Sequence, residues 1–254
     1  MKKNPKRIGL AIIGAGRVGL FRGEVAARHP QVDFIGLAEI KPERAKLVAG
    51  KVGADFVTAD YRELLARPEV TAVIVSTDEH LHVEPILAAV ERGLPLLIEK
   101  PLATRLDESA RVLKAIKEAK VDAVVGYTQR FRRRWLAAKE KCRTGALTID
   151  DTHSDIVLAV SKGQSEGYNP DPTRLVDFMG SYPPGDMALG ELRGPMALET
   201  DSWLNRVALG LPTAAATVEE AHRNLMLTKA LDLSAKRKAP VKLPLDPDDM
   251  KAAA

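Results

Sequence analysis

The chain has 254 residues, of which 45% are hydrophobic and 28% charged, with a formal net charge of +4. These values are ordinary for one or two globular domains. No apolar run approaches the length of a membrane helix, and the basic segment Met1–Arg7 leads into a strand without the small-residue cleavage site of a signal peptide. The single cysteine, Cys142, excludes an internal disulfide framework and favours a cytoplasmic location.

A dense basic cluster, Arg130–Trp135, raises the question of nucleic-acid binding. Aromatic residues make up only 4% of the chain, so few side chains are available to stack on bases. We therefore expect no nucleic-acid partner and interpret the cluster as a charged helix start, with Phe131 and Trp135 facing inward at i, i+4 spacing.

Up to about residue 127, apolar strand-like runs alternate with amphipathic helix-like stretches. Such alternation predicts a doubly wound parallel sheet of the α/β class, with helices on both faces. The predicted strands are Ile8–Ile13, Val32–Ala38, Asp55–Thr58, Thr71–Ser76, Pro95–Ile98 and Ala123–Tyr127, and the predicted helices include Pro42–Lys51, Leu81–Arg92 and Leu106–Lys120.

The first predicted strand runs directly into Gly14-Ala-Gly16-Arg17-Val18-Gly19, and a helix follows. In this G-x-G-x-x-G pattern Gly14 allows a tight turn, Gly16 lets the backbone approach a pyrophosphate, and Gly19 permits close helix–strand packing. The helix N-terminus adds free N–H groups and a partial positive charge. The segment therefore predicts a dinucleotide site.

An acidic residue, Glu39, closes the second strand 25 residues after Gly14. A carboxylate at this place accepts hydrogen bonds from the adenosine ribose and repels a 2′-phosphate, which favours NAD. Lys41 and Arg44 follow within one turn and leave NADP as the alternative, although a solvated first helical turn also explains them.

Right-handed crossovers place the carboxyl ends of all these strands along one rim, where ligands bind in open α/β sheets. The segments at this rim are the glycine loop, Glu39, Ser76–His82 and Glu99–Pro101.

Beyond the alternating part, Ala197–Leu209 is predicted as a helix that Gly210-Leu-Pro212 stops, and Thr217–Glu220 as a capping box opening a helix to about Arg237. A short strand over Val241–Leu243 is expected after it. Between about 145 and 196 the pattern gives only two plausible strands, Ala146–Ile149 and Ile156–Val160, and then a long stretch rich in Gly, Pro and Asp.

Five segments together resemble the Gfo/Idh/MocA oxidoreductases, the family of glucose–fructose oxidoreductase and inositol dehydrogenase. They are Gly14–Gly19, Ser76–His82, Glu99-Lys100-Pro101, Gly126–Phe131 and Leu209–Ala221. The resemblance covers residues 7–142 and about 197–244.

This resemblance implies a dinucleotide-binding Rossmann domain over 1–127 and a second α+β domain over 128–254. In the family the second domain is built on a large antiparallel sheet, which walls the substrate cleft and commonly forms the oligomer interface. The implied reaction is hydride transfer between a nicotinamide and a carbinol carbon of a sugar or polyol. Such a transfer needs a group that handles the hydroxyl proton.

Lys100 is the catalytic candidate that the resemblance places beside nicotinamide and substrate, and Glu99 either anchors Lys100 or contacts the ribose. The resemblance also places His82 in the cofactor pocket, and Pro101 is a possible cis residue. The full set of predicted cofactor-binding residues is Gly14, Gly16, Arg17, Val18, Gly19, Glu39, Ser76, Thr77, His82, Glu99 and Lys100, with no metal ligands.

Two features depart from the family pattern. Asp78 and Glu79 stand where the family usually has Pro-Asn or similar residues, and the G-x-H-x-x-D segment that carries the acid/base histidine is missing. His153 has H-x-D spacing, but its context is that of a late strand.

Only about fifty residues separate Arg143 from Ala197, too few for a wide sheet. We interpret this as an internal deletion joined near Thr144-Gly145, which leaves the second domain truncated and the oligomeric state open. A divergent short member with a minimal cap is the alternative. A deletion predicts new exposed apolar surface or a rearranged packing of Ala197–Arg237.

Three functions remain open at this point: an NAD(P)-dependent dehydrogenase acting on a small sugar- or polyol-like molecule, a dinucleotide-binding module without efficient turnover, and a scaffold that keeps only the fold.

Overall fold

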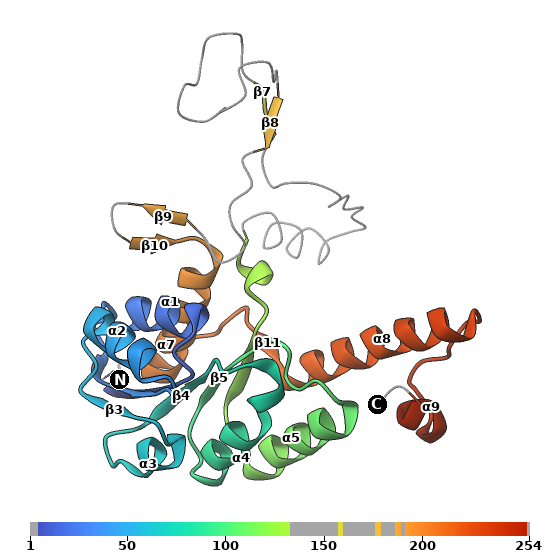
Figure 1. Ribbon diagram of the computed structural model, residues 1–254, viewed down its shortest axis with the longest axis horizontal. Helices are drawn as coiled ribbons and strands as arrows, with labels where there is room; N and C mark the ends of the chain where they lie inside the picture. Colours follow the sequence, from blue (N-terminus) through green and yellow to red (C-terminus); the bar gives the residue numbers. More distant parts are fainter. Residues whose placement is uncertain (1–4, 133–156, 160–175, 179–185, 189–190, 253–254) are drawn as a thin grey trace.

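The computed structural model describes residues 5–132, 157–159, 176–178, 186–188 and 191–252. Its centre is a seven-stranded sheet in the order β11-β6-β5-β4-β1-β2-β3 (Figure 1). All neighbouring strands are parallel except β11, which is antiparallel to β6. The strands are β1 (Ile8–Ile13), β2 (Val32–Ala38), β3 (Phe56–Thr58), β4 (Ala72–Val75), β5 (Leu96–Glu99), β6 (Ala123–Gly126) and β11 (Ala216–Thr217).

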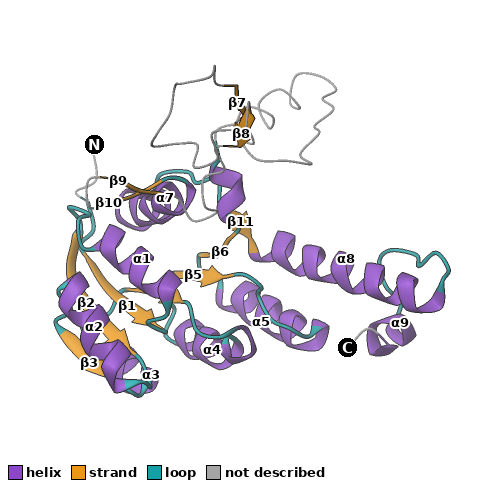
Figure 2. Cartoon of the chain, turned by 45° about the horizontal axis from the view of Figure 1, so that its top comes forward, coloured by secondary structure: helices purple, strands orange, loops and turns teal. Residues whose placement is uncertain are grey.

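Helices cover both faces of this sheet, which confirms the predicted doubly wound α/β fold (Figure 2). None of the helices in the described part of the chain is long and apolar enough to cross a membrane. The helices are α1 (Arg17–Ala26), α2 (Pro42–Val52), α3 (Tyr61–Ala66), α4 (Val83–Glu91), α5 (Leu106–Ala119), α7 (Pro195–Leu209), α8 (Val218–Arg237) and α9 (Pro247–Ala252), with 3-10 turns η1 (Glu79–Leu81) and η2 (Thr128–Phe131).

Two hydrophobic cores lie on opposite faces of the sheet, because successive side chains of a strand point to opposite sides. In β1, Leu10 and Ile12 face the core under α1, α2 and α7, whereas Ala11 and Ile13 face the core under α3, α4 and α5. The strands β1 and β4 are buried on both faces and are therefore continuous apolar runs, as is typical of a parallel sheet.

The segment around α7 packs directly onto the nucleotide-binding half of the sheet. Trp203 is fully buried in the same core as Leu97 and Val124, and Leu204 joins it. The helix lies beside α1 (Figure 1). Residues from the C-terminal region thus complete a core that begins at β1, and the boundary at residue 127 stays a prediction.

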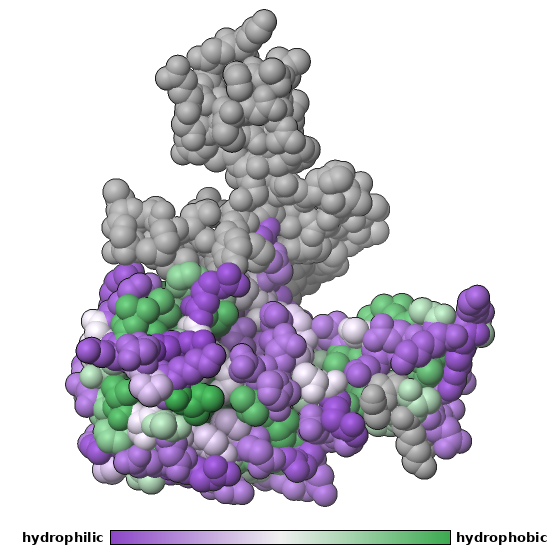
Figure 3. All heavy atoms as spheres, viewed as in Figure 1, coloured by the Kyte–Doolittle hydropathy of each residue, from purple (hydrophilic) through white to green (hydrophobic). Residues whose placement is uncertain are grey.

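The long helix α8 starts with the predicted capping box. Thr217 Oγ1 accepts a hydrogen bond from the Glu220 amide at 3.2 Å, and Glu220 Oε2 accepts one from the Thr217 amide at 2.9 Å. Its first turns pack against α5, and its distal part extends from the body beside α9 (Figures 1 and 2). Leu227 and Leu231, one turn apart on α8, are exposed, and apolar atoms are visible on this helix in Figure 3.

Some predicted elements differ from the structure. Val241–Leu243 is not a strand: no described strand lies beside it, and Val241 instead packs into a small cluster with Leu233. The helix predicted from Leu81 begins at Val83, because Glu79–Leu81 forms the separate turn η1.

Of the basic cluster Arg130–Trp135 only residues 130–132 are described, so the helix start interpreted there stays a prediction. Thr128–Phe131 is a short 3-10 turn, in which Phe131 is buried and Arg130 pairs with Glu220 at 3.0 Å. Trp135 lies outside the described residues.

Short antiparallel strand pairs account for the described part of the middle region. They are β7 (Val157–Ala159) with β8 (Val176–Phe178), and β9 (Asp186–Ala188) with β10 (Glu191–Arg193). The predicted strand Ala146–Ile149, the junction at 144–145 and His153 lie outside the described residues.

A Ser–His pair joins α5 to α8. Ser109 is fully buried, and its Oγ lies 2.8 Å from Nδ1 of His222. Burial of the ring, and secondarily the positive charge of Lys117, lower the pKa of His222 below its ordinary value of 6.5. The folded chain therefore favours the neutral imidazole.

We expect Trp203→Ala to lower the free energy of unfolding by about 3–5 kcal/mol, because it opens a cavity where α7 meets the sheet. Leu198→Ala is the matched control on the same helix, since Leu198 is 52% exposed. Its effect should stay within about 0.5 kcal/mol. Urea unfolding followed by circular dichroism measures both, and equal effects would contradict the packing of α7 described above.

The lowered pKa of His222 predicts a loss of stability as the pH falls through the range below 6.5, because the unfolded chain then binds a proton more readily than the folded one. Urea midpoints at pH 7.5 and 5.5 should therefore differ more in the wild type than in His222→Gln. His80→Gln, at an exposed histidine, should retain the wild-type difference. An unchanged pH dependence in His222→Gln would refute this role of the Ser109–His222 pair.

Candidate functional site

The glycine loop lies where β1 meets α1. Gly14 has φ +90°, a conformation that side chains rarely adopt, and its amide donates to the Ala38 carbonyl at 2.9 Å. A Cβ on Gly19 would stand 2.1 Å from the Gly14 carbonyl oxygen, so α1 approaches the loop too closely for any other residue. Around Gly16, by contrast, nothing lies within 4 Å of such a Cβ. The loop is closed on the protein side and open on the side where a phosphate would approach.

Two side chains hold this loop in place. Ser76, which follows β4, donates from Oγ to the Gly14 carbonyl at 2.8 Å. Glu39 is buried and accepts from the Ala15 amide through Oε2 and from the Lys41 amide through Oε1, each at 2.9 Å. The acid predicted as a ribose acceptor thus also links the glycine loop to the start of α2.

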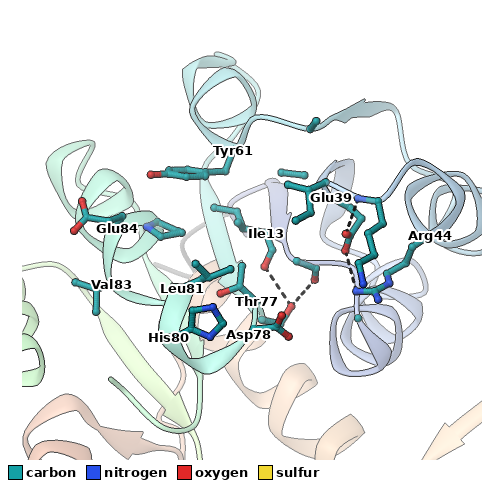
Figure 4. A pocket seen from close by; sticks show the side chains of 18 of the residues that line it. Ile13, Glu39, Arg44, Tyr61, Thr77, Asp78, His80, Leu81, Val83 and Glu84 are labelled. Carbon is teal, nitrogen blue, oxygen red and sulfur yellow. Dashed lines mark hydrogen bonds and ion pairs between the residues drawn. The ribbon is translucent and has the colours of Figure 1, made fainter. Parts of the chain in front are cut away.

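A positive side chain stands near Glu39. Nη1 of Arg44, which is partly exposed, lies 3.5 Å from Glu39 Oε2. Figure 4 shows the two side chains together at one wall of a cavity, with Thr77, Asp78 and Leu81 across from them.

The cavity has a volume of about 350 Å³ and lies beside the glycine loop at the carboxyl ends of β1, β2 and β4. It brings together five of the predicted cofactor residues, Gly14, Gly16, Glu39, Ser76 and Thr77. The remaining predicted residues, Arg17, Val18, Gly19, His82, Glu99 and Lys100, are not part of its lining.

The cavity is also lined by residues that were not predicted from the sequence as cofactor-binding residues. Ile40 is 71% exposed directly after the acid, and Leu81 is 46% exposed on η1, although such side chains normally bury. Tyr61 at the start of α3 adds an aromatic side. The isoleucine directly after the acid was the available sequence signal. His80, and not His82, faces this cavity.

His82 lies in the interior of the protein, behind the residues that line the cavity. It is buried, with Nδ1 2.8 Å from the Pro101 carbonyl oxygen and Nε2 3.1 Å from the Thr77 carbonyl oxygen. It therefore connects the segment after β4 with the segment after β5. The Lys100–Pro101 peptide bond in the latter is cis.

Lys100 follows β5 at the same rim, and its side chain is 59% exposed. Its Nζ lies 4.0 Å from Glu79 Oε1, so one of the two acidic residues that depart from the family pattern faces this lysine. The other, Asp78, lines the cavity.

Glu99 turns away from Lys100 into the core under α1 and α7. Its Oε1 accepts from Nε of the fully buried Arg22 at 2.6 Å. Arg22 also donates from Nη2 to Glu199 Oε2 at 2.8 Å and from Nη1 to Thr200 Oγ1 at 2.9 Å, both on α7. Thr128 Oγ1 donates to the same oxygen of Glu199 at 2.9 Å.

Burial and charge act against each other in this cluster. Burial lowers the pKa of Arg22, but the charges of Glu99 and Glu199 outweigh burial and raise it above the ordinary value. Burial raises the pKa of Glu199, an effect that the neighbouring Arg22 offsets only in part. Sequence reasoning missed Arg22 and Glu199, which are far apart in the chain.

A family model described as "Oxidoreductase family, NAD-binding Rossmann fold" matches residues 8–127, the stretch that contains the glycine loop, Glu39 and Lys100. Residues 8–127 match the Gfo/Idh/MocA family. The predicted resemblance is confirmed for this stretch, and so is its NAD-binding character.

Individual relatives agree with this assignment. The chain is 30% identical over 138 residues to a scyllo-inositol 2-dehydrogenase (NAD(+)) of Bacillus subtilis, covering 54% of this chain and 40% of that protein. It is 34% identical over 146 residues to an inositol 2-dehydrogenase of Acidothermus cellulolyticus, covering 56% and 41%. The crystal structure of GenD2 from gentamicin A biosynthesis in complex with NAD matches with a TM-score of 0.51 and 26% identity, over 54% of this chain and 39% of that one.

The family model matches residues 8–127, and similar curated proteins align with this chain over 126–150 residues. The similarity covers 37–41% of the length of the first curated relatives. It therefore shows the fold and cofactor class of the nucleotide-binding domain, while the reaction of the whole chain is a proposal.

Because the space around Gly16 is open, a substitution there can affect cofactor binding without affecting the stability of the fold. We expect Gly16→Ala to leave the urea midpoint unchanged, because its backbone (φ −65°, ψ −173°) suits alanine, yet to weaken NADH binding by at least about tenfold. NADH fluorescence titration measures the binding. Gly50→Ala on α2, which also meets nothing within 4 Å, is the matched control and should bind as the wild type does. Tight NADH binding by Gly16→Ala would show that the pyrophosphate lies elsewhere.

Proposed function

We propose that the chain is an NAD-dependent dehydrogenase that transfers a hydride between the nicotinamide and a carbinol carbon of a sugar- or polyol-like molecule. One observation carries the proposal: a preformed, open glycine loop and its cavity lie on the same sheet rim as Lys100. The inositol dehydrogenases among the relatives support this class of substrate. The single Cys142 agrees with a cytoplasmic location.

The cofactor would bind with its pyrophosphate at Gly16 and the first amides of α1, where free N–H groups and the helix dipole favour negative charge. Glu39 would accept hydrogen bonds from the adenosine ribose, since each carboxylate oxygen has two lone pairs and only one backbone amide is bound to each. Ile40 and Leu81 offer apolar surface for the purine. When bound, NAD supplies the hydride acceptor.

Glu39 and Arg44 bear on the choice between NAD and NADP. The carboxylate of Glu39 repels a 2′-phosphate, and the charge of Arg44 is partly engaged by Glu39 at 3.5 Å. The balance favours NAD.

Lys100 would bind the substrate hydroxyl and take part in transfer of its proton. Loss of a hydride from the carbinol carbon leaves a carbonyl and releases the hydroxyl proton, so a group must hold and accept that proton. Lys100 lies at the rim on a flexible side chain, where its Nζ as a neutral amine would accept the hydroxyl proton and the resulting ammonium would release that proton to solvent. Among the described residues, the side-chain partner near its Nζ is Glu79.

A binding module without efficient turnover is the second candidate, and the positions of the histidines favour it. His82 is engaged with two carbonyl oxygens, His222 lies beside Ser109, and His29 lies 3.8 Å from Asp201. His80 lines the cavity, and the fifth histidine, His153, is outside the described residues. Among the described residues, no histidine is hydrogen-bonded or ion-paired to Lys100, whose side-chain partner is Glu79.

Titration with NADH and NADPH, followed by turnover assays with NAD and a panel of inositols and sugars, tests the proposal. We expect saturable binding that is tighter for NADH. Lys100→Ala should lower kcat by about 100-fold or more while changing the Kd for NADH less than twofold. Lys114→Ala, at an exposed lysine of α5, is the matched control with unchanged kcat.

Two results would count against the enzyme. Wild-type turnover that survives in Lys100→Ala would discard the role of Lys100. Tight NADH binding without turnover of any compound in the panel would favour the binding module.

A further inference from the structure

The adjacent residues Glu99 and Lys100 carry opposite charges at the end of β5, yet they are kept apart. Glu99 is 7% exposed, whereas the Lys100 side chain is 59% exposed. Two neighbours of opposite charge on a flexible segment would normally attract each other, and such a pair would occupy the ammonium that the proposed reaction needs.

The alternation of β5 sets the side of the sheet from which the Glu99 side chain starts, and its partners then place the carboxylate. Leu97 belongs to the core under α1 and α7, Ile98 to the opposite core, and Glu99 to the first side again. Its carboxylate lies beside the backbone of β6, where a Cβ on Gly126 would stand 3.1 Å from Glu99 Oε1 and 2.5 Å from Arg22 Nη2. Gly126 thus leaves the space in which the two side chains meet.

Arg22 supplies the attraction on that side. It donates to Glu99 through Nε at 2.6 Å and also forms an ion pair through Nη2. Both side chains are buried, so the pair is little screened by water or salt. Lys100, exposed to solvent, competes weakly for the same carboxylate.

Arg22 is itself fixed from α7. Glu199 and Thr200 occupy its other two nitrogens, and Glu199 is held by Thr128 from η2. The guanidinium therefore has its donors directed at fixed acceptors on three sides, and its fork geometry leaves little freedom to turn.

We infer that Arg22 is a positioning residue, which holds the Glu99 carboxylate in the core under α1 and α7 and so keeps it off the neighbouring Lys100 ammonium. The inference rests on the proposed role of Lys100 in the reaction. The charged groups that face the two residues from the described elements are Glu79 at Lys100, and Arg22 and Glu199 at Glu99. His82 lies nearby against the Pro101 carbonyl oxygen.

The test measures the reactivity of Lys100 without any turnover. Acetic anhydride transfers an acetyl group to the unprotonated Nζ, with loss of acetate and a proton, so the rate against pH reports how strongly the ammonium is stabilised. Peptide mass spectrometry quantifies acetylation at Lys100. Lys114 serves as the internal reference, because it is an exposed lysine on α5 that forms no hydrogen bond or ion pair with Arg22 or Glu99.

The double variant Arg22→Met/Glu199→Gln removes the cation that pairs with Glu99. It also neutralises Glu199, so that Glu199 is not left as an unpaired buried charge. We expect the released carboxylate to pair with Lys100 and to raise the midpoint of its acetylation profile by about one pH unit, which makes acetylation about tenfold slower below the midpoint. Adding Glu99→Gln to the double variant should restore the wild-type midpoint. A wild-type midpoint in the folded double variant would overturn the inference.

Glu99→Gln alone decides the matter if circular dichroism shows that the double variant does not fold. Since Arg22 already holds the Glu99 charge, this variant should keep the midpoint within about 0.3 pH unit. A larger fall of the midpoint would show that Glu99 acts on Lys100 in the wild type and would overturn the inference. NADH titration of the same variants tests the cofactor site separately, so failure of the proposed function and failure of this inference are distinguishable.

Discussion

The geometry of the rim depends on one buried cation. Arg22 is fully enclosed, and burying a charge is tolerated only where partners replace the lost water. Those partners come from β5 and α7, so the first helix, the end of a central strand and a helix about 180 residues later in the chain are tied at one point. Removing one partner of such a buried pair typically costs about 3–5 kcal/mol. The position of the segment after β5 is therefore specified by charge as well as by packing.

The cofactor half of the site is fixed by a second set of bonds that needs no ligand. Ser76 and Glu39 bind backbone groups of the glycine loop, and Glu39 also joins the loop to α2. The loop thus holds the shape that a pyrophosphate requires before any pyrophosphate is present, and little conformational entropy remains to be lost on binding. The same bonds explain why Glu39 is buried although it faces a cavity.

Local signals predicted much of this structure. The strands β1 to β6, the glycine loop, the acid at Glu39 and the capping box at Thr217 all follow from patterns within a few residues. Val241–Leu243 has the composition of a strand but no described strand to pair with, and the pattern could not reveal that.

Contacts between distant segments could not be predicted in this way. Arg22 and Glu199 look like ordinary charged residues of amphipathic helices, and only the fold brings them together across 177 positions. The two-residue strand β11 is likewise too short to give a pattern of its own, and it exists because β6 offers a free edge. The cavity residue Ile40 follows β2 and Tyr61 begins α3, and the two meet only through the order of β1, β2 and β3.

The position of α7, β11 and α8 bears on how shortening would act on this protein. Trp203 and Leu204 cover the sheet face that Leu97 and Val124 would otherwise expose, and β11 covers the edge of β6. Glu199 and Thr200 complete the cluster at Arg22. These elements are therefore part of the nucleotide-binding body, although they come late in the chain. The two elements that flank the stretch from 132 to 194, η2 and α7, are in contact with each other. A change of length between those two ends need not open the core beneath α7, so the proposed binding of the dinucleotide and the proposed turnover can be lost separately.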